Sequence, residues 1–366
     1  MQTHECHVLI VGAGPAGIAA ACAARESGIS VTVVDDNPAA GGQIWRGAIP
    51  EPWRDRFRAE VIADTRVVSS IQPGVLLAES PAQALALRYR KLILAPGSRE
   101  LLLPFPGWTL PNVVAAGGLQ ALVKCGLPVE DKRVVLAGTG PLLLAVSHYL
   151  RKRGARVYSG GRIVAAQGEG KVQAALLRLR RTTWLEPCDY LACSFGLIAN
   201  VELPQLLGCA LRNGSVAVDE WQKTSRRGVY YAGRPGGVGL AIAEGQIAGY
   251  ACAGLKRHAL RLFPARLWAR TLQSALDWAF PLRDEWKSLP RPETVICRCE
   301  DVTLGALDRH RGWRSAKLEN RCGMGPCQGR VCGAAIEYLL GWKPESVRPP
   351  IFPVRAETLA AIHWKK

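Results

Sequence analysis

The sequence predicts an α/β fold of two parallel-sheet domains, the second one shortened, followed by a small cysteine-rich helical domain. Two glycine-rich turns, at residues 12–17 and 138–143, each follow a strand-like apolar run and open a helix-like run. Strand, turn and helix in this order indicate a parallel βαβ unit. Five of the chain's twelve cysteines lie within residues 297–332, beside glycines and arginines, and mark the third domain.

Length and composition suit a folded chain of this size. The 366 residues are enough for about two domains and a small appendage. Hydrophobic residues make up 48% of the chain and charged residues 21%, which excludes a largely disordered protein.

No membrane span is expected, because glycine, proline and histidine interrupt the longest apolar run, residues 134–150. Residues 1–24 carry Glu5 and no basic leader, so we expect no secretion signal and a cytoplasmic protein. In that compartment the cysteines outside residues 297–332 are expected to be reduced and structural. They are Cys6, Cys22, Cys125, Cys188, Cys193, Cys209 and Cys252.

The formal net charge is +17. The basic residues are spread along the chain, without the interleaved aromatics or the helix-turn-helix and zinc-finger spacings of nucleic-acid-binding modules, so no nucleic acid partner is expected. We interpret most of them as solvated faces. The remainder favours docking of an acidic subunit or electron carrier.

The first glycine-rich turn has the features of a dinucleotide site. Gly12 permits the tight turn, Gly14 lets backbone amides approach a pyrophosphate, and Gly17 allows close packing of helix on strand. The next strand ends in Asp35, whose carboxylate can accept hydrogen bonds from ribose hydroxyls. In this context a glycine-rich turn without a ligand is the less favoured alternative.

The second turn contains Gly138 and Gly140, follows an apolar strand and opens a helix that runs to about Lys152. No acidic residue ends the next strand at Val157, and the glycine-rich segment 160–172 follows almost at once, which leaves little room for another helix and strand. We therefore favour a structural remnant, and a working NAD(P) site stays an alternative.

Residues 255–292 are rich in Trp, Leu and Arg, with apolar positions at helical spacing until Pro281. We interpret this stripe as core or interface packing. The Leu-Pro-Arg-Pro sequence at 289–292 indicates a stiff linker before the cysteines.

The cysteine-rich segment has the composition of a soft-metal site. Cys297 and Cys299 lie on a short extended piece, and Cys327 and Cys332 lie on a glycine-rich loop that enters a helix. Thiolates beside glycines, arginines and a helix N-terminus suit an anionic iron–sulfur centre better than a disulfide. Structural zinc is the less favoured alternative, because this spacing is unusual for zinc. The cations expected to stabilise the centre are Arg298, Lys317, Arg321 and Arg330.

Six further segments carry a resemblance to a known family: residues 33–46, with Val-Val-Asp-Asp and Gly-Gly-Gln-Ile-Trp-Arg, and residues 92–100, 104–111, 134–143, 188–200 and 228–249. With the cysteine segment they cover nearly the whole chain. They resemble the FAD-containing subunit of the heteromeric amine dehydrogenases, which include opine oxidase, D-hydroxyproline dehydrogenase and hydrogen cyanide synthase.

The resemblance implies a two-dinucleotide-binding-domain flavoprotein with the glutathione-reductase-like FAD/NAD(P) fold. Relative to the family, about half of the second domain is missing. The C-terminal domain is similar to bacterioferritin-associated ferredoxin and is implied to bind [2Fe–2S]. We divide the chain into an FAD-binding domain (1–106 and 213–254), a truncated NAD(P)-type domain (107–212), a helical linker (255–292), a [2Fe–2S] domain (293–345) and a tail (346–366).

The resemblance also implies the site residues. The FAD contacts are Gly12, Gly14, Gly17, Asp35, Gly42, Gln43, Ala95, Gly97 and Gly233, and the cluster ligands are Cys297, Cys299, Cys327 and Cys332. Cys322 stands where the family has a small residue. Two positions depart from the FAD pattern, since Arg234 replaces an acidic residue and Pro96 a threonine. Arg234 cannot accept hydrogen bonds from ribityl hydroxyls, but it can pair with a phosphate or with a partner's carboxylate.

No catalytic side chain is expected, because the six histidines form no cluster with a nucleophile or a metal site. The resemblance implies an electron-transfer subunit. A separate flavin-containing subunit would oxidise an amine such as an opine, D-hydroxyproline, proline or glycine. Electrons would pass through FAD and [2Fe–2S] to a small ferredoxin-like subunit, to another carrier or, through peripheral contact, to the respiratory chain. A stand-alone NAD(P)H-dependent reductase and a non-catalytic assembly subunit that has lost FAD stay as alternatives.

Overall fold

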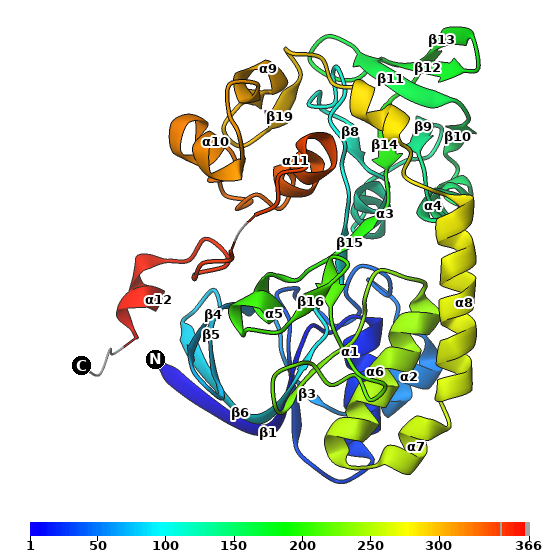
Figure 1. The fold of residues 1–366 in the computed structure, drawn as a ribbon. Helices are drawn as coiled ribbons and strands as arrows, with labels where there is room; N and C mark the ends of the chain where they lie inside the picture. The colour runs from blue at the N-terminus through cyan, green and yellow to red at the C-terminus, as the bar shows by residue number, and fades with distance from the viewer. Residues whose placement is uncertain (345, 363–366) are drawn as a thin grey trace. The chain divides into compact units, whose positions relative to one another are not determined.

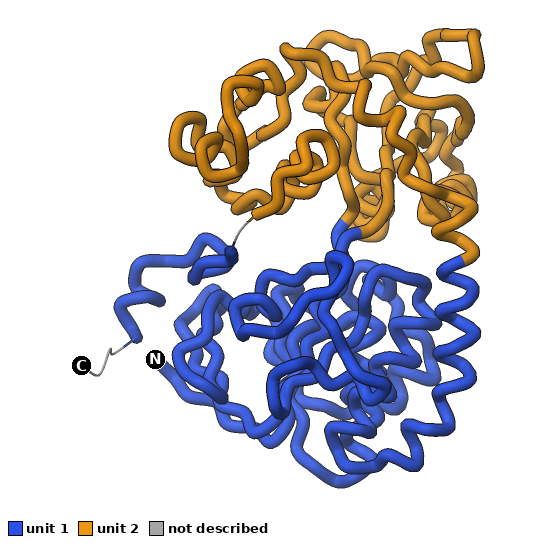
Figure 2. Tube along the Cα trace, in the orientation of Figure 1, with its two compact units in different colours: residues 1–99, 198–274, 346–366 blue, residues 100–197, 275–345 orange. Residues whose placement is uncertain are grey.

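The structure is a computed structural model that describes residues 1–344 and 346–362. The chain forms two compact units, shown in different colours in Figure 2. Unit 1 contains residues 1–99, residues 198–274 and the segment from 346 onward, and unit 2 contains residues 100–197 and 275–345. The segment 255–292, expected as a linker, is divided between the two units at residue 274.

Unit 1 is built on a seven-stranded sheet (Figure 1). Across the sheet the order is β3 (Glu60–Ile62), β2 (Val31–Val34), β1 (Gln2–Val11), β6 (Ala84–Leu94), β5 (Val75–Glu79) and β4 (Arg66–Gln72), and β18 (Val229–Tyr231) also pairs with β6. The β3-β2-β1-β6 pairings and the β18 pairing are parallel, and β4 and β5 are antiparallel additions. Val8 and Ile10 pack on one face of β1 and Leu9 on the other, so both faces are covered.

Two helices of unit 1, α1 (Pro15–Arg25) and α6 (Val238–Ala253), pack closely on each other and on the first of these faces. Small residues permit this, because a Cβ added at Gly245 or Gly249 would overlap a backbone carbonyl oxygen of α1. The alanine-rich α1 is buried from Pro15 to Ala24. The contact therefore fixes α1, which begins at the first glycine turn.

The smaller elements of unit 1 lie around this core. They are α2 (Glu51–Arg56), α5 (Glu202–Leu206), α7 (Lys256–Leu260) and the hairpin of β16 (Leu211–Arg212) with β17 (Ser215–Val216). The long helix α8 (Phe263–Ala279) begins in unit 1 and ends in unit 2, just before Pro281, as the sequence pattern predicted. Strands β7 (Ser98–Glu100) and β15 (Leu197–Ala199) form a separate two-stranded sheet.

The C-terminal segment 346–362 packs on β4 and β5 and contains the short helix α12 (Ala356–Ala360). The Ile351 N–H donates to the carbonyl oxygen of Val68 at 2.8 Å. The buried Thr358 hydroxyl donates to Glu79 Oε1 at 2.6 Å, and Arg355 pairs with the same oxygen at 3.2 Å. This segment is therefore part of unit 1.

Unit 2 contains a four-stranded parallel sheet in the order β10 (Arg156–Ser159), β9 (Arg133–Gly138), β14 (Tyr190–Ser194) and β8 (Val113–Ala115). Helices α3 (Ala116–Lys124) and α4 (Leu142–Arg151) cover it through Leu119, Val146 and Leu150. After β10 the chain passes directly into an antiparallel sheet of β11 (Arg162–Gln167), β12 (Ala174–Leu179) and β13 (Thr182–Pro187). Segment 160–172 thus contains β11, the first of the antiparallel strands. Strand β10 is the edge strand of the parallel sheet.

The cysteine-rich part of unit 2 is small and mostly helical. Its elements are the 3-10 turn η1 (Asp284–Ser288), the paired strands β19 (Val295–Cys297) and β20 (Val302–Thr303), and helices α9 (Leu304–Leu307), α10 (Trp313–Asn320) and α11 (Cys332–Leu340). Its core joins Ile296, Leu307, Trp313 and Ile336 to buried cysteines. Among the described residues, no helix has the length and apolarity needed to cross a bilayer.

Candidate cofactor sites

The first glycine turn has the backbone geometry that the sequence predicted. Gly12 has φ +104° and lies so close to Ala95 that a Cβ would overlap the Ala95 carbonyl oxygen. A Cβ at Gly17 would likewise overlap the carbonyl oxygen of Gly12. At Gly14 nothing lies within 4 Å of the Cβ position. The turn therefore needs glycine twice for packing, and at Gly14 it leaves open space beside the backbone.

Helix α1 presents an uncapped N-terminus to this space. Gly14 is the N-cap residue, Pro15 occupies the first turn, and no side chain caps the helix among the described residues. The free backbone N–H groups and the helix dipole favour an anion here. This geometry fits a pyrophosphate.

Asp35 is directed at the same turn. Its side chain is buried, Oδ2 accepts the Ala13 N–H at 2.5 Å, and Oδ1 accepts the Asn37 N–H at 2.8 Å and the Asn37 Nδ2 at 2.6 Å. Each carboxylate oxygen has two acceptor positions, so one position remains, on Oδ2, for a ribose hydroxyl. Asp35 is thus held at the end of β2, beside the turn.

Three more segments meet the turn within unit 1. Gly41 donates its N–H to the Ala13 carbonyl oxygen at 2.8 Å, and a Cβ at Gly42 would lie 2.9 Å from the Cα of Gly14. Ala95 follows β6 and touches Gly12, and a Cβ at Gly233 would lie 3.0 Å from the Cβ of Ala16. The structure therefore brings together seven of the nominated FAD contacts: Gly12, Gly14, Gly17, Asp35, Gly42, Ala95 and Gly233.

Gln43 and Gly97 also belong to unit 1. Gln43 follows Gly42 and is exposed. Gly97 has φ +68°, and its carbonyl oxygen accepts the Asn200 N–H at 3.1 Å. The Asn200 side chain donates to the carbonyl oxygen of Pro96 at 2.8 Å, so Asn200 supports the 96–97 turn.

Arg234, the main departure from the FAD pattern, forms an ion pair with Glu244. The distance from Arg234 Nε to Glu244 Oε1 is 2.8 Å, and Arg270 Nη2 lies 3.1 Å from the same oxygen. Glu244 is fully buried, whereas both arginines are partly exposed. This triad could have been suspected from the sequence, because Glu244 is the one charged residue of the apolar helix α6.

The second glycine turn, in unit 2, partly repeats the geometry of the first. Gly138 has φ +118°, and a Cβ there would overlap the Ser194 carbonyl oxygen, while Gly140 has φ +121° and open space at its Cβ position. Two features differ. Leu143 stands where the first turn has Gly17, and the following strand β10 ends without a carboxylate. This turn therefore lacks the carboxylate that would bind a ribose and the third glycine that allows close packing of the helix on the strand.

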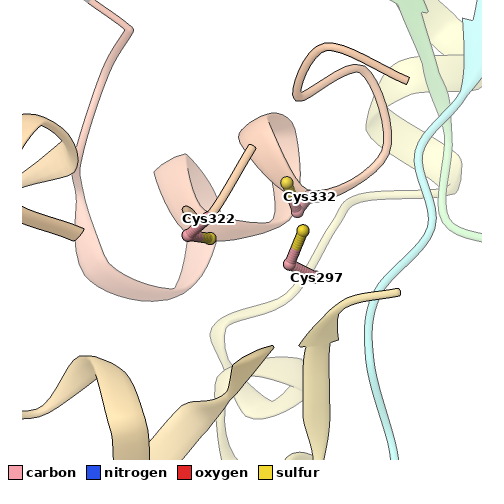
Figure 3. A group of neighbouring side chains, drawn as sticks. All are labelled: Cys297, Cys322 and Cys332. Atoms are coloured by element: carbon pink, nitrogen blue, oxygen red, sulfur yellow. The ribbon is translucent and has the colours of Figure 1, made fainter. Parts of the chain in front are cut away.

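Three cysteines of unit 2 form a buried group, drawn in Figure 3. Cys297 ends β19, Cys322 follows α10, and Cys332 begins α11. Their sulfur atoms all lie within 4.8 Å of one another, and each residue is at most 1% exposed. Cys322, which was not among the nominated ligands, is thus a member of this buried group.

The other two nominated ligands continue from this group. The half-buried Cys327 side chain hydrogen-bonds to Cys332 and to Cys299, and Cys299 is exposed. Gly325 packs against Cys299, since a Cβ there would lie 3.3 Å from the Cys299 sulfur. Cys297, Cys299, Cys327 and Cys332 are therefore brought together, with Cys322 as a fifth thiol.

The surroundings lower the pKa of two of these thiols, Cys297 and Cys327, and raise the pKa of Cys299, Cys322 and Cys332. Hydrogen bonds with Cys322 and Cys332 hold the pKa of the Cys297 thiol well below its usual range, and the Gly323 N–H lies 3.5 Å from its sulfur. By contrast, burial raises the pKa of Cys252 to about 12 and that of Cys188 to about 11. No disulfide joins the cysteines of the described residues, and a raised pKa disfavours the reactive thiolate form of those two.

The cations nominated for this site are mostly engaged elsewhere. Arg298 stacks on Trp108 at 5.3 Å, Lys317 lies 5.7 Å from the ring of Trp313, and Arg321 pairs with Glu300 at 2.8 Å. Only Arg330 contacts a ligand residue in the described part of the chain, donating to the Cys327 carbonyl oxygen at 3.4 Å. Backbone N–H groups and the α11 N-terminus are therefore the main local source of positive potential.

The ring of Trp313 packs against the cysteine loop, a contact that was not predicted from the sequence. A Cβ at Gly323 would lie 2.7 Å from its ring, one at Gly329 3.3 Å, and one at Gly333 3.7 Å. Gly323 and Gly329 also have φ +76°. The glycines between the cysteines thus let the loop approach the indole ring closely, and their spacing was the available signal.

The donor set fits a metal centre with sulfur ligands. Metal–sulfur bonds of about 2.3 Å at tetrahedral angles place two sulfurs roughly 3.8 Å apart. The buried sulfurs lie within 4.8 Å of one another, which requires little movement. Thiolate ligands suit iron–sulfur centres and zinc.

The helix α8 differs from its expected packing. Its apolar side chains Leu267, Trp268, Leu272 and Trp278 are 67%, 69%, 45% and 86% exposed. Core packing is therefore wrong for these four positions, and the interface alternative remains.

Comparison with known proteins identifies the family of this chain. The family model described as "Pyridine nucleotide-disulphide oxidoreductase" matches residues 6–158 and 143–234. An opine oxidase subunit of Rhizobium meliloti is 28% identical and is aligned with 97% of this chain and 87% of its own length. Hydrogen cyanide synthase subunit HcnB of Pseudomonas protegens is 27% identical over 88% of this chain and 89% of its own length.

Solved structures agree on the fold. L-proline dehydrogenase from P. horikoshii superimposes with a TM-score of 0.76 over 98% of this chain and 80% of its own, at 18% identity. Thioredoxin reductase from T. acidophilum covers 70% of this chain and 99% of its own, with a TM-score of 0.53 and 22% identity. The predicted α/β two-domain fold is thereby confirmed.

The sequence alignments also bear on the second domain. The alignment with the Rhizobium meliloti opine oxidase subunit runs over 458 positions, more than the 366 residues of this chain. That relative therefore carries residues inside the aligned region which this chain lacks. The two matches of the family model overlap at residues 143–158, the part of unit 2 where the parallel sheet stops at β10.

Proposed function

Since this chain belongs to the pyridine nucleotide-disulphide oxidoreductase family, which implies FAD, we propose that it is the electron-transfer subunit of a heteromeric dehydrogenase. It would hold FAD in unit 1 and a [2Fe–2S] cluster in unit 2. The observation that carries the proposal is the group of five thiols in the same chain as a dinucleotide turn. The relatives from opine oxidase and hydrogen cyanide synthase are subunits by their names and support a multi-subunit enzyme.

The residues of unit 1 suggest how FAD would be held. The α1 N-terminus with Gly12, Gly14 and Gly17 would bind the pyrophosphate, and Asp35 would accept a hydrogen bond from a ribose hydroxyl. Gly42, Gln43, Ala95, Gly97 and Gly233 would line the remainder of the cofactor. Arg234 would be turned away from the ribityl chain by its pairing with Glu244.

FAD bound there would accept two electrons and pass them on singly, which suits a one-electron iron–sulfur centre. Cys297, Cys299, Cys327 and Cys332 are the proposed ligands. The loop packed against Trp313 would exclude water from the inner thiols, because Cys297 and Cys332 are buried. Cys299, at the surface, would be the ligand nearest to an external electron acceptor.

The partner would be a flavin-containing subunit that oxidises an amino-acid-like amine to an imine. Opines, D-hydroxyproline, proline and glycine are the substrates that the family resemblance suggests. The exposed apolar stripe of α8 and the charge of +17 support docking of acidic subunits, among them a small ferredoxin-like one. Peripheral delivery to the respiratory chain is the proposed outlet.

Cofactor content tests the proposal first. The purified protein is expected to contain about one FAD, two irons and two acid-labile sulfides per chain. Illumination with a photoreductant should then bleach the flavin and produce the electron paramagnetic resonance signal of a reduced [2Fe–2S] centre. Zinc without sulfide would contradict the cluster, and cluster without extractable flavin would favour the alternative of a non-catalytic protein that serves assembly.

A second candidate, a stand-alone NAD(P)H-dependent reductase, is favoured by one observation: Gly138 has the positive φ and the close carbonyl contact of Gly12, and Gly140 leaves open space at its Cβ position as Gly14 does. Anaerobic stopped-flow mixing with NADH and with NADPH separates the two functions. Our proposal predicts that neither nucleotide bleaches the flavin within seconds. Rapid bleaching by either one would favour the reductase.

A further inference from the structure

The cysteine-rich domain offers five thiols to a centre that needs four. A two-iron cluster of the kind proposed above takes two protein thiolates on each iron. Four of the five cysteines are the nominated ligands, and Cys322 is in excess. The role of Cys322 inferred below depends on the proposed cluster.

The five thiols divide unequally between an inner and an outer group. Cys297, Cys322 and Cys332 form the inner group, buried, with all sulfur–sulfur distances within 4.8 Å. Cys299 and Cys327 form the outer group, more exposed and linked to each other by a side-chain hydrogen bond. In the described part of the chain, no third cysteine has its sulfur within 4.8 Å of the sulfurs of both Cys299 and Cys327.

The inner group has the geometry of alternative ligands. Two thiolates on one tetrahedral iron lie roughly 3.8 Å apart. Because every pair among the three inner sulfurs is within 4.8 Å, any two of them can reach one iron through small side-chain movements. The three also come from different segments, β19, the loop after α10 and the start of α11, so losing one leaves the other two in place.

From this geometry we propose that Cys322 is an interchangeable ligand of the inner iron. When the sulfur of Cys297 or Cys332 is absent, the Cys322 thiol releases its proton to water and its sulfur forms the iron–sulfur bond in place of the missing one. No electron is gained or lost in this exchange. The outer iron has no additional thiol within reach, so Cys299 and Cys327 are both required for cluster binding.

The competing explanation is that Cys322 is only a core residue. It packs with Ile296, Trp313 and Ile336, and small buried cysteines are common in cores. A core residue contributes to folding stability in every variant. An interchangeable ligand contributes to metal content only when another inner ligand is missing, and this difference can be measured.

The test uses alanine variants of the full chain: Cys297→Ala, Cys332→Ala and Cys322→Ala singly, and Cys297→Ala and Cys332→Ala each combined with Cys322→Ala. Cys299→Ala is the outer control. Iron and sulfide per chain, the visible spectrum and the paramagnetic resonance of the reduced protein are the readouts. FAD content and circular dichroism report folding, since the FAD turn lies in unit 1.

We expect each inner single variant to keep at least half of the wild-type iron and sulfide, with a shifted resonance for Cys297→Ala and Cys332→Ala. Both double variants and Cys299→Ala should keep less than a tenth. Equal iron content in Cys297→Ala and its double variant would overturn the proposal. A wild-type protein without sulfide would instead refute the proposed cluster itself, so the two failures are distinguishable.

Discussion

At the scale of single residues, the cysteine loop depends on glycines that face one aromatic ring. Gly323 and Gly329 have positive φ and lie against Trp313. Glycine is required there for conformation and for space at once. The position of Cys322 follows from its neighbour Gly323, so the inner thiol group depends on this packing.

Gly323→Ala should therefore lower both stability and metal content. The Cβ would lie 2.7 Å from Trp313 at φ +76°, and strain with overpacking should cost about 2 kcal/mol or more of unfolding free energy. Urea unfolding followed by tryptophan fluorescence and an iron assay measure these effects. Gly341→Ala is the control, since Gly341 has φ +74° and open space. Equal losses in the two variants would contradict the role of Trp313.

Gly14→Ala tests the other site without a packing clash. Gly14 has φ −75° and nothing within 4 Å of its Cβ position, so alanine should leave the apoprotein stable within about 0.5 kcal/mol. The added methyl group would occupy the space beside the α1 N-terminus, so FAD affinity should fall at least about tenfold, or 1.4 kcal/mol. Fluorescence titration of apoprotein with FAD measures the affinity, and the equally open Gly312→Ala in unit 2 is the control. An unchanged affinity would exclude the proposed pyrophosphate position.

At the scale of elements, one carboxylate at the end of β5 holds the helical turn of the C-terminal segment. Glu79 accepts hydrogen bonds from Thr358 and Arg355, at the two ends of the first turn of α12. Although partial burial opposes its ionisation, these hydrogen bonds hold the pKa of Glu79 below its ordinary value. The contribution of Glu79 to this attachment is therefore electrostatic and depends on pH.

The sign of that dependence follows from linkage. Because the folded-state pKa is depressed, the stabilisation is present above the ordinary glutamate pKa of about 4.3 and is lost as pH falls through the lower folded value. Glu79→Gln should reproduce this loss at neutral pH and increase hydrogen exchange at Ile351 and Thr358. Glu357→Gln removes an exposed partner of the same Arg355 and should change little. Equal exchange in both variants would contradict the assigned role of Glu79.

At the scale of the whole molecule, each cofactor is expected to support its own unit. The core of the cysteine-rich domain is small, and a bound metal commonly supplies folding free energy to such domains. Metal removal with a chelator under reducing conditions should increase hydrogen exchange throughout residues 295–340. FAD content should stay unchanged, because all the nominated flavin contacts lie in unit 1. Unchanged exchange in 295–340 would show that the thiol group does not depend on metal.

The local parts of this architecture could be predicted from the sequence. Gly12, Gly14 and Asp35 follow one another in a single βαβ unit, so their spacing alone fixes where they meet. Cys297 and Cys332 were found by composition and resemblance. Their metal, cluster type and ligand set stay predictions.

The long-range parts could not be predicted, because they depend on packing between distant segments. Cys322 joins the inner thiols only once α10 has placed it beside β19 and α11. Glu244 and Arg270, like Glu79 and Thr358, are paired across different elements. No spacing rule connects such residues. The exposure of the apolar side chains of α8 could not be predicted either, because it depends on the packing of the helix in the folded chain.

The close contact of α1 with α6 has a consequence for engineering this protein. Replacing helix glycines by alanine usually raises stability, because alanine restricts the unfolded chain and favours the helix. In α6 that route is closed at Gly245 and Gly249, whose Cβ atoms would strike the backbone of α1, and open at Gly239, where nothing lies within 4 Å. A thermostable variant would have to gain its helix propensity at the exposed start of α6 and leave the seam of the two helices untouched.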